Sequence, residues 1–168
     1  GWTMPSLFIQ RGNLRSGLLS GVVVFVLLYV GIIAAYLLYF HGTDGVTLGK
    51  LLSATPLVFV LSLFNAPNEE LWFRGLFLKR WERDVGARSA NLLQAPAFTV
   101  AHYVPEFTRF GDAFLISFLL LAFAAAIGFG YMMQKTGSLL GSSIAHMGAD
   151  VAIFMAVVLG ITSAGLGS

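Results

Sequence analysis

Long apolar runs dominate this chain, and short polar stretches separate them. The runs lie near residues 17–40, 56–80, 88–104, 112–134 and 138–160. A helix needs roughly 20 apolar residues to cross the hydrocarbon core of a bilayer, and only helices or closed barrels satisfy their backbone polar groups there. The run near 88–104 is short and contains Pro96, so it is the weakest of the five. The pattern predicts an all-α, polytopic integral membrane protein, a single transmembrane domain over residues 1–168 with about five transmembrane helices.

Composition supports lipid as the solvent of this chain. Apolar residues make up 57% of it and charged residues only 11%, whereas a soluble domain carries about a quarter charged residues. The chain has no cysteine, which excludes disulfides, thiolate metal ligands and a cysteine nucleophile. Since no basic stripe with interleaved aromatic residues occurs, we predict the lipid bilayer and no nucleic acid as a partner.

The positions of the basic residues predict an orientation in the membrane. Lysine and arginine favour cytoplasmic loops. One side of the predicted bundle carries seven of them, and the other side carries only Lys50 and Arg109; the seven are Arg11, Arg15, Lys79, Arg80, Arg83, Arg88 and Lys135. We therefore expect an integral protein of the plasma (inner) membrane with its N-terminus in the cytoplasm.

Six ionisable residues lie in or near the apolar helices, where such side chains are costly and by default mark function. They are Glu69, Glu70, Arg74, His102, His146 and Asp150. At 1.5 Å of rise per residue, Glu69 and His146 lie roughly 16 Å below the basic anchors, and His102 and Asp150 roughly 21–22 Å. Three separate helices therefore deliver polar groups to one layer, which predicts an intramembrane polar site.

The facing of these residues and their summed charge indicate the chemistry of the site. Residues four apart share a helix face, which pairs Glu70 with Arg74 and His146 with Asp150. Glu69 points about 100° away from Glu70, so we expect the two carboxylates to do different work. Three carboxylates against one arginine leave a net charge of −2 with neutral histidines, so the site must take up protons or bind a dication. A carboxylate beside a histidine is suited to activating water.

Three short motifs carry a family resemblance. Glu69 to Arg74 fits EExxxR and continues into Gly75, Phe98 to His102 fits FxxxH, and His146 to Asp150 fits HxxxN/D. In this order on successive helices they resemble the CAAX protease and bacteriocin-processing (CPBP, or ABI) family of intramembrane proteases, over about residues 56–155. The resemblance implies an endopeptidase that hydrolyses a peptide bond at or in the membrane, with a membrane-bound substrate, lipidated in some relatives.

The resemblance also implies roles for the six residues. Glu69 and His102 would activate water, His146 and residue 150 would stabilise the oxyanion, and Glu70 and Arg74 would shape the site and balance its charge. Relatives are described both as glutamate proteases and as metalloproteases. An ionised Asp150 cannot donate a hydrogen bond to an oxyanion, so it is protonated, orients His146 or binds a metal. Glu69, His102, His146 and Asp150 are candidate ligands for one zinc ion.

Three other functions compete with this one. A serine intramembrane protease would use Ser143 with His146, but the two are only three residues apart on one helix. A proton- or ion-coupled carrier would also need carboxylates and histidines at depth, but no inverted repeat is visible. A non-catalytic immunity or scaffold protein on the same fold would not need the full polar set. We assign Asn65, Asn68 and Asn91 no function beyond capping or helix contacts.

Overall fold

The computed structural model describes residues 9–40 and 46–161, and its regular structure there is entirely helical. A π-helical segment, Leu71–Leu78, separates α2 from α3, and a 3₁₀ segment, Pro105–Phe110, separates α4 from α5. The six α-helices are α1 (Leu14–Phe40), α2 (Leu48–Glu70), α3 (Lys79–Val85), α4 (Ala87–Ala101), α5 (Asp112–Thr136) and α6 (Leu139–Val158). The predicted all-α class is confirmed.

Four helical stretches in the described part of the chain are long and apolar enough to cross a membrane. They are Leu14–Phe40, Leu48–Val85, Asp112–Thr136 and Leu139–Val158. The remaining predicted span, near 88–104, forms α4, which has only 15 residues and would extend about 22 Å at 1.5 Å per residue. It is therefore shorter than a bilayer core, and it packs against α5, α3 and the π-helical segment.

Capping residues explain where two of the spans begin. The helix predicted to start near residue 56 begins at Leu48, because the Thr47 hydroxyl accepts from the Lys50 amide, and Pro56 then lies within the helix. Ser138 accepts from the Leu140 amide in the same way and starts α6. Between α5 and α6, Gly137 adopts a left-handed conformation with φ of 69°, which glycine reaches without strain.

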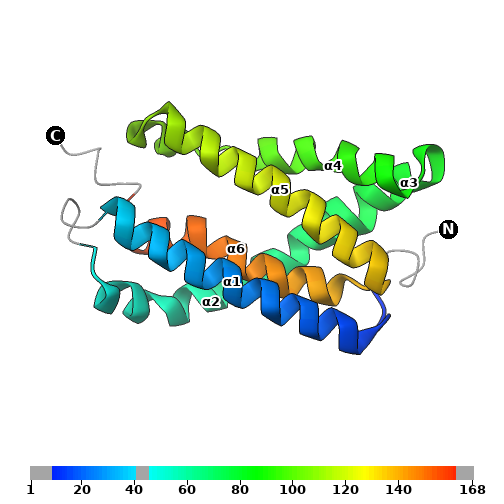
Figure 1. Ribbon diagram of the computed structural model, residues 1–168, viewed down its shortest axis with the longest axis horizontal. Helices are drawn as coiled ribbons and strands as arrows, with labels where there is room; N and C mark the ends of the chain where they lie inside the picture. The colour runs from blue at the N-terminus through cyan, green and yellow to red at the C-terminus, as the bar shows by residue number, and fades with distance from the viewer. Residues whose placement is uncertain (1–8, 41–45, 162–168) are drawn as a thin grey trace.

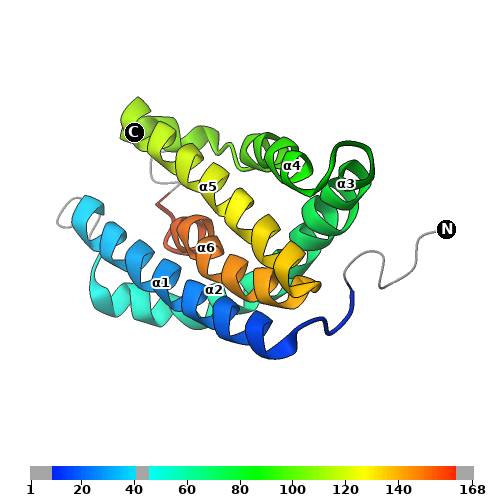
Figure 2. The same cartoon turned by 45° about the vertical axis from the view of Figure 1, so that its right-hand side comes forward.

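Helix α6 is the centre of the bundle. Figures 1 and 2 show it between α1 and α2 on one side and α5 on the other. It crosses α1 so closely that a Cβ on Gly141 would lie 2.7 Å from the Gly17 carbonyl oxygen. Twelve of its 20 residues are buried, His146 and Asp150 among them. The two candidate residues of α6 are thus held on the most enclosed helix of the molecule.

The helix that carries the paired glutamates runs without a break from Leu48 to Val85, but its geometry changes at the glutamates. Regular α-helix ends at Glu70 and the π-helical segment follows at once, with Arg74 and Gly75 buried inside it. Such i→i+5 segments are rare and often occur at functional sites. Gly86, with φ of 80°, then turns the chain into α4, which brings His102 back towards the glutamates.

Three places in the chain meet at one end of the bundle: the start of α1, the α3–α4 turn and the α5–α6 turn. The Asn13 amide donates to the Thr136 carbonyl over 2.7 Å, and the Gln134 side chain donates to the Ala87 carbonyl over 2.9 Å. These bonds join the start of α1, the start of α4 and the α5–α6 turn (Figure 1). The seven basic residues assigned above to the predicted cytoplasmic side flank these three places.

Candidate active site

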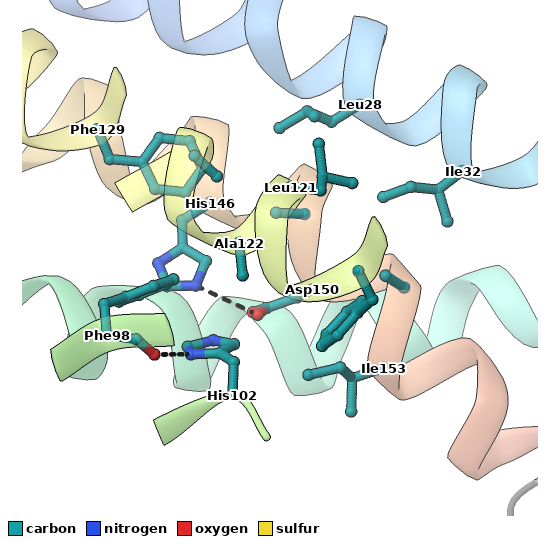
Figure 3. Close-up of a pocket in the computed structure, with 14 residues that line it drawn as sticks. Leu28, Ile32, Phe98, His102, Leu121, Ala122, Phe129, His146, Asp150 and Ile153 are labelled. Atoms are coloured by element: carbon teal, nitrogen blue, oxygen red, sulfur yellow. Dashed lines mark hydrogen bonds and ion pairs between the residues drawn. The ribbon is translucent and has the colours of Figure 1, made fainter. Parts of the chain in front are cut away.

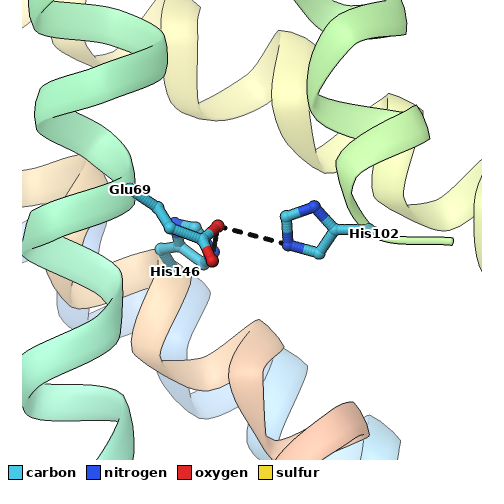
Figure 4. A group of neighbouring side chains, drawn as sticks. All are labelled: Glu69, His102 and His146. Atoms are coloured by element: carbon cyan, nitrogen blue, oxygen red, sulfur yellow. Dashed lines mark ion pairs between the residues drawn. The ribbon is translucent and has the colours of Figure 1, made fainter. Parts of the chain in front are cut away.

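Glu69, His102 and His146 come together from three helices. The Glu69 Oε2 atom lies 3.3 Å from His102 Nε2 and 3.6 Å from His146 Nε2, as Figure 4 shows. Neither contact is a regular hydrogen bond, and Oε2 is buried with no hydrogen-bond partner in the described part of the chain. One carboxylate oxygen thus faces two imidazole nitrogens, and all three groups can share a single proton, water or cation.

The other nitrogen of each imidazole is already used. His102 Nδ1 lies 2.8 Å from the Phe98 carbonyl oxygen, and His146 Nδ1 lies 2.9 Å from Glu70 Oε1. Since a carbonyl or ionised carboxylate oxygen can only accept, each Nδ1 must carry the hydrogen. Each Nε2 is therefore directed at Glu69 either as a lone pair or, in a doubly protonated ring, as a second donor.

Beneath this group lies a fully buried ion-pair cluster. Glu70 Oε1 is 2.9 Å from Arg74 Nη1 and 2.9 Å from His146 Nδ1. Arg74 also donates from Nη2 to the Ala126 carbonyl of α5 over 3.2 Å. Buried ions are tolerated only when they are paired and hydrogen-bonded. The cluster Glu70, Arg74 and His146 therefore fixes α2, α5 and α6 relative to one another through charge.

Aromatic rings enclose the charged groups. The Arg74 guanidinium lies 4.3 Å from the Phe98 ring centroid and 5.5 Å from that of Phe129. Phe129 also stacks on His146 at 5.2 Å, and Phe98 stacks on His102 at 4.0 Å. A cation over an aromatic face is stabilised by the ring quadrupole. Phe98 thus positions both Arg74 and His102, and Phe129, which the sequence reasoning missed, supports His146.

Asp150 and Asn65 complete the polar layer. Asp150 Oδ1 lies 3.5 Å from His146 Nε2, one helical turn along α6. The Asn65 amide nitrogen lies 3.0 Å from Glu69 Oε1 and 3.3 Å from Asp150 Oδ1. Sequence reasoning assigned Asn65 no role, although its four-residue spacing from Glu69 was the signal that could have found it.

An apolar cavity of about 40 Å³ adjoins these groups. Figure 3 shows His102, His146 and Asp150 on one side of it and Leu28, Ile32 and Leu121 on the other. A second apolar cavity of about 170 Å³ continues between α1 and α5, sharing Ile32, Phe118, Leu121 and Ala152 with the first. Burial falls across the site, from 1% side-chain exposure at His146 to 25% at Glu69. Glu69 is therefore the most exposed charged side chain of the site.

Comparison with family models gives this geometry its context. The model described as type II CAAX prenyl endopeptidase Rce1-like matches residues 51–152, more than half of the 168 residues. The chain belongs to this Rce1-like family. The match runs from α2 into α6 and contains all six candidate residues. No curated protein and no solved structure matched the chain in the corresponding comparisons.

Membership in the Rce1-like family confirms the resemblance drawn from the three motifs. It identifies the chain with a family of membrane-embedded CAAX endopeptidases, and the four described helices that are long and apolar enough to cross a membrane agree with that class. The family assignment does not select between a glutamate protease and a metalloprotease, and it assigns no role to any one residue. The roles inferred for the six residues therefore remain predictions.

The candidate site has a donor set that fits one metal ion. Glu69, His102 and His146 each offer a ligand atom, and these atoms lie within 4.8 Å of one another. Metal-binding histidines commonly donate their other ring N–H to a carbonyl or carboxylate, as His102 does to Phe98 and His146 to Glu70. Two imidazoles and one carboxylate with an open position form a zinc donor set.

Proposed function

We propose that this chain is an intramembrane endopeptidase that hydrolyses a peptide bond near the C-terminus of a membrane-bound, prenylated protein. One observation carries the proposal: Glu69, the most exposed charged side chain of the site, directs its Oε2 at the Nε2 atoms of both histidines. The family assignment supports the reaction class and the prenylated substrate class.

Glu69 and His102 are proposed to activate the attacking water. Because His102 Nδ1–H donates to the Phe98 carbonyl, its Nε2 can accept one hydrogen of a water while Glu69 Oε2 accepts the other. As the water oxygen bonds to the scissile carbonyl carbon, Glu69 takes its proton. That proton then passes to the leaving nitrogen as the C–N bond breaks.

His146 is proposed to stabilise the oxyanion. When the ring carries both protons, Nδ1–H donates to the Glu70 carboxylate and Nε2–H is free to donate to the developing negative charge. Nδ1 lies 2.9 Å from Glu70 Oε1, and this contact fixes the direction of Nε2. Asp150 accepts from His146 Nε2 between turnovers and keeps the ring directed at the site, since an ionised carboxylate cannot itself be an oxyanion donor.

The charge of the site can be balanced in two ways. Three carboxylates and Arg74 sum to −2, and either the uptake of two protons by the site or the binding of one divalent cation would cancel that charge. In the second case Glu69, His102 and His146 would hold the ion. A bound zinc ion would supply Lewis acidity towards the scissile carbonyl.

The lining of the cavities supports a substrate with an apolar group. The two neighbouring cavities are walled largely by aliphatic and aromatic side chains, and the smaller one is lined by His102 and His146. A peptide attached to a hydrocarbon chain can place that chain against such a wall while its scissile bond reaches Glu69.

The deciding experiment is cleavage by the reconstituted protein. Peptide libraries ending in farnesylated CAAX sequences, and the same libraries without the lipid, are incubated with wild type and with Glu69→Gln, with and without a zinc chelator. We expect release of the C-terminal residues only by the wild type. If the chelator abolishes activity and added zinc restores it, a metal ion balances the charge of the site. If the protein is fully active without retained zinc, protons balance that charge. Equal cleavage by Glu69→Gln contradicts the proposal.

We further propose that the N-terminus and the α3–α4 turn lie on the cytoplasmic side of the plasma membrane. The basic residues around the meeting point of the three places in the chain support this orientation. Because the chain has no cysteine, single cysteines at the exposed positions Ser89 and Asp112 report sidedness directly. A membrane-impermeant maleimide added to intact cells should label Asp112→Cys and spare Ser89→Cys, and the reverse pattern contradicts the orientation.

A further inference from the structure

Asn65 bridges the two carboxylates that lie nearest the reacting position. It lies on α2 one turn before Glu69, and its amide nitrogen is 3.0 Å from Glu69 Oε1. The same nitrogen lies 3.3 Å and 3.4 Å from the two oxygens of Asp150, which is 85 residues away on α6. A single amide therefore connects the carboxylate of α2 with that of α6.

The chemistry of the amide suits this position. An asparagine NH₂ group has two hydrogens and can serve two acceptors at once, whereas ionised carboxylates can only accept. Glu69 and Asp150 both approach His146 Nε2, at 3.6 Å and 3.5 Å, so their like charges lie close together. A neutral double donor between them reduces that repulsion without adding a charge to the site.

The bridge also determines how Glu69 is oriented. The terminal torsion of a glutamate is broad and roughly two-fold, so an unrestrained carboxylate turns easily about its last bond. Asn65 holds Oε1, and this directs Oε2 at the Nε2 atoms of both histidines. Because Oε2 has no hydrogen-bond partner of its own in the described part of the chain, its direction depends on what holds Oε1.

We propose that Asn65 is a positioning residue for hydrolysis, acting through Glu69 by fixing the rotation of its carboxylate and reducing its repulsion with Asp150. This role rests on the proposed function, in which Glu69 is the base. The prediction concerns the donor group of Asn65. Its shape is matched by aspartate, which cannot donate when ionised, and its donor is retained by glutamine.

The test measures kcat and KM at neutral pH with an internally quenched peptide ending in a farnesylated CAAX sequence. The variants are Asn65→Leu, Asn65→Asp, Asn65→Gln and the control Asn68→Leu, the same substitution at an exposed asparagine one residue before Glu69. We expect kcat to fall roughly 10- to 100-fold in Asn65→Leu and at least as far in Asn65→Asp, as for a misdirected catalytic group, with KM within about two-fold. Asn65→Gln should recover part of the loss, and Asn68→Leu should match the wild type.

A double variant shows whether Asn65 acts through Glu69. Adding Asn65→Leu to Glu69→Gln should not reduce the residual rate further, because residues that act as a unit are not additive. If Asn65→Leu fails to fold, the shape-matched Asn65→Asp decides the question: a kcat within two-fold of wild type overturns the inference. If Glu69→Gln retains wild-type activity, the proposed function fails instead, so the two failures are distinguishable.

Discussion

Glu69 and Glu70 are adjacent in the sequence and lie in opposite environments. Glu70 is fully buried and is paired with Arg74 and His146, each at 2.9 Å. Glu69 is 25% exposed, and its Oε2 lies more than 3 Å from either histidine. The Glu70 carboxylate belongs to a closed cluster, formed with Arg74 and His146, in which every charge has a partner at contact distance. The Glu69 carboxylate belongs to an open face, formed with His102, where a reactant can still be admitted.

This comparison separates stability from reactivity within one dipeptide. Charges in the closed cluster are desolvated, so removing any of them leaves a buried ion uncompensated. Charges on the open face are less constrained, and their orientation depends on weaker contacts such as those of Asn65. His146 belongs to both regions, because its Nδ1 faces Glu70 and its Nε2 faces Glu69.

The largest effect is expected from removing the base on the open face. Glu69→Gln should reduce turnover about 10²- to 10⁴-fold, the contribution of general acid–base catalysis. Its thermal unfolding in detergent should remain that of the wild type, since the glutamine oxygen can still accept from Asn65. If Glu69→Gln instead loses activity because the protein unfolds, the open face and the closed cluster are not separable.

Opening the closed cluster should have the reverse signature. Arg74→Leu leaves Glu70 and His146 buried without the guanidinium, and breaking a buried pair costs about 3–5 kcal/mol. We expect a lower unfolding midpoint and reduced accumulation in the membrane, measured by denaturant titration in micelles. Wild-type stability in Arg74→Leu would mean that water or a proton compensates Glu70.

The two histidines allow a matched comparison, because His102 belongs to the open face and His146 also belongs to the closed cluster. Both His102→Gln and His146→Gln should lower kcat at least about 100-fold. Only His146→Gln should also destabilise the protein, by about 1–3 kcal/mol, because it disturbs the buried hydrogen bond to Glu70. Equal unfolding midpoints for the two variants would remove His146 from the closed cluster.

The smallest effect is expected from an ion pair with the same spacing outside the site. Arg80 and Asp84 are also four residues apart, 2.8 Å from each other, but their side chains are 56% and 55% exposed. Asp84→Asn should therefore change stability by less than about 0.5 kcal/mol and leave turnover unchanged. Its contrast with Arg74→Leu measures what burial alone adds to the same pairing.

The membrane class and the identity of the polar residues were within reach of the sequence. Apolar runs of spanning length are a direct signal for helices in lipid, and a charged residue inside such a run is costly enough to be informative by itself. Glu69, His102 and His146 were found on that basis, and the structure brings them within 4.8 Å of one another.

Other features depend on tertiary packing and could not be predicted. Helix α4 ends at Ala101 and leaves His102 at its C-terminal boundary, so this histidine approaches Glu69 from a helix end. Phe129 belongs to an apolar run in which nothing distinguishes it from its neighbours, yet it stacks on His146. Asn65 resembles an ordinary helical asparagine until α6 places Asp150 beside it.

The π-helical segment Leu71–Leu78 has a consequence for how this chain tolerates insertions and deletions. Loss of one residue between Glu70 and Arg74 could be absorbed by a return to regular α-helix, leaving the span nearly as long as before. It would also change the spacing between Glu70 and the arginine from four residues to three, a spacing at which two side chains still share a helix face. A one-residue deletion here is therefore compatible with both the span and the pairing, so a strict four-residue spacing is too narrow a criterion for choosing functional homologues or shortened variants.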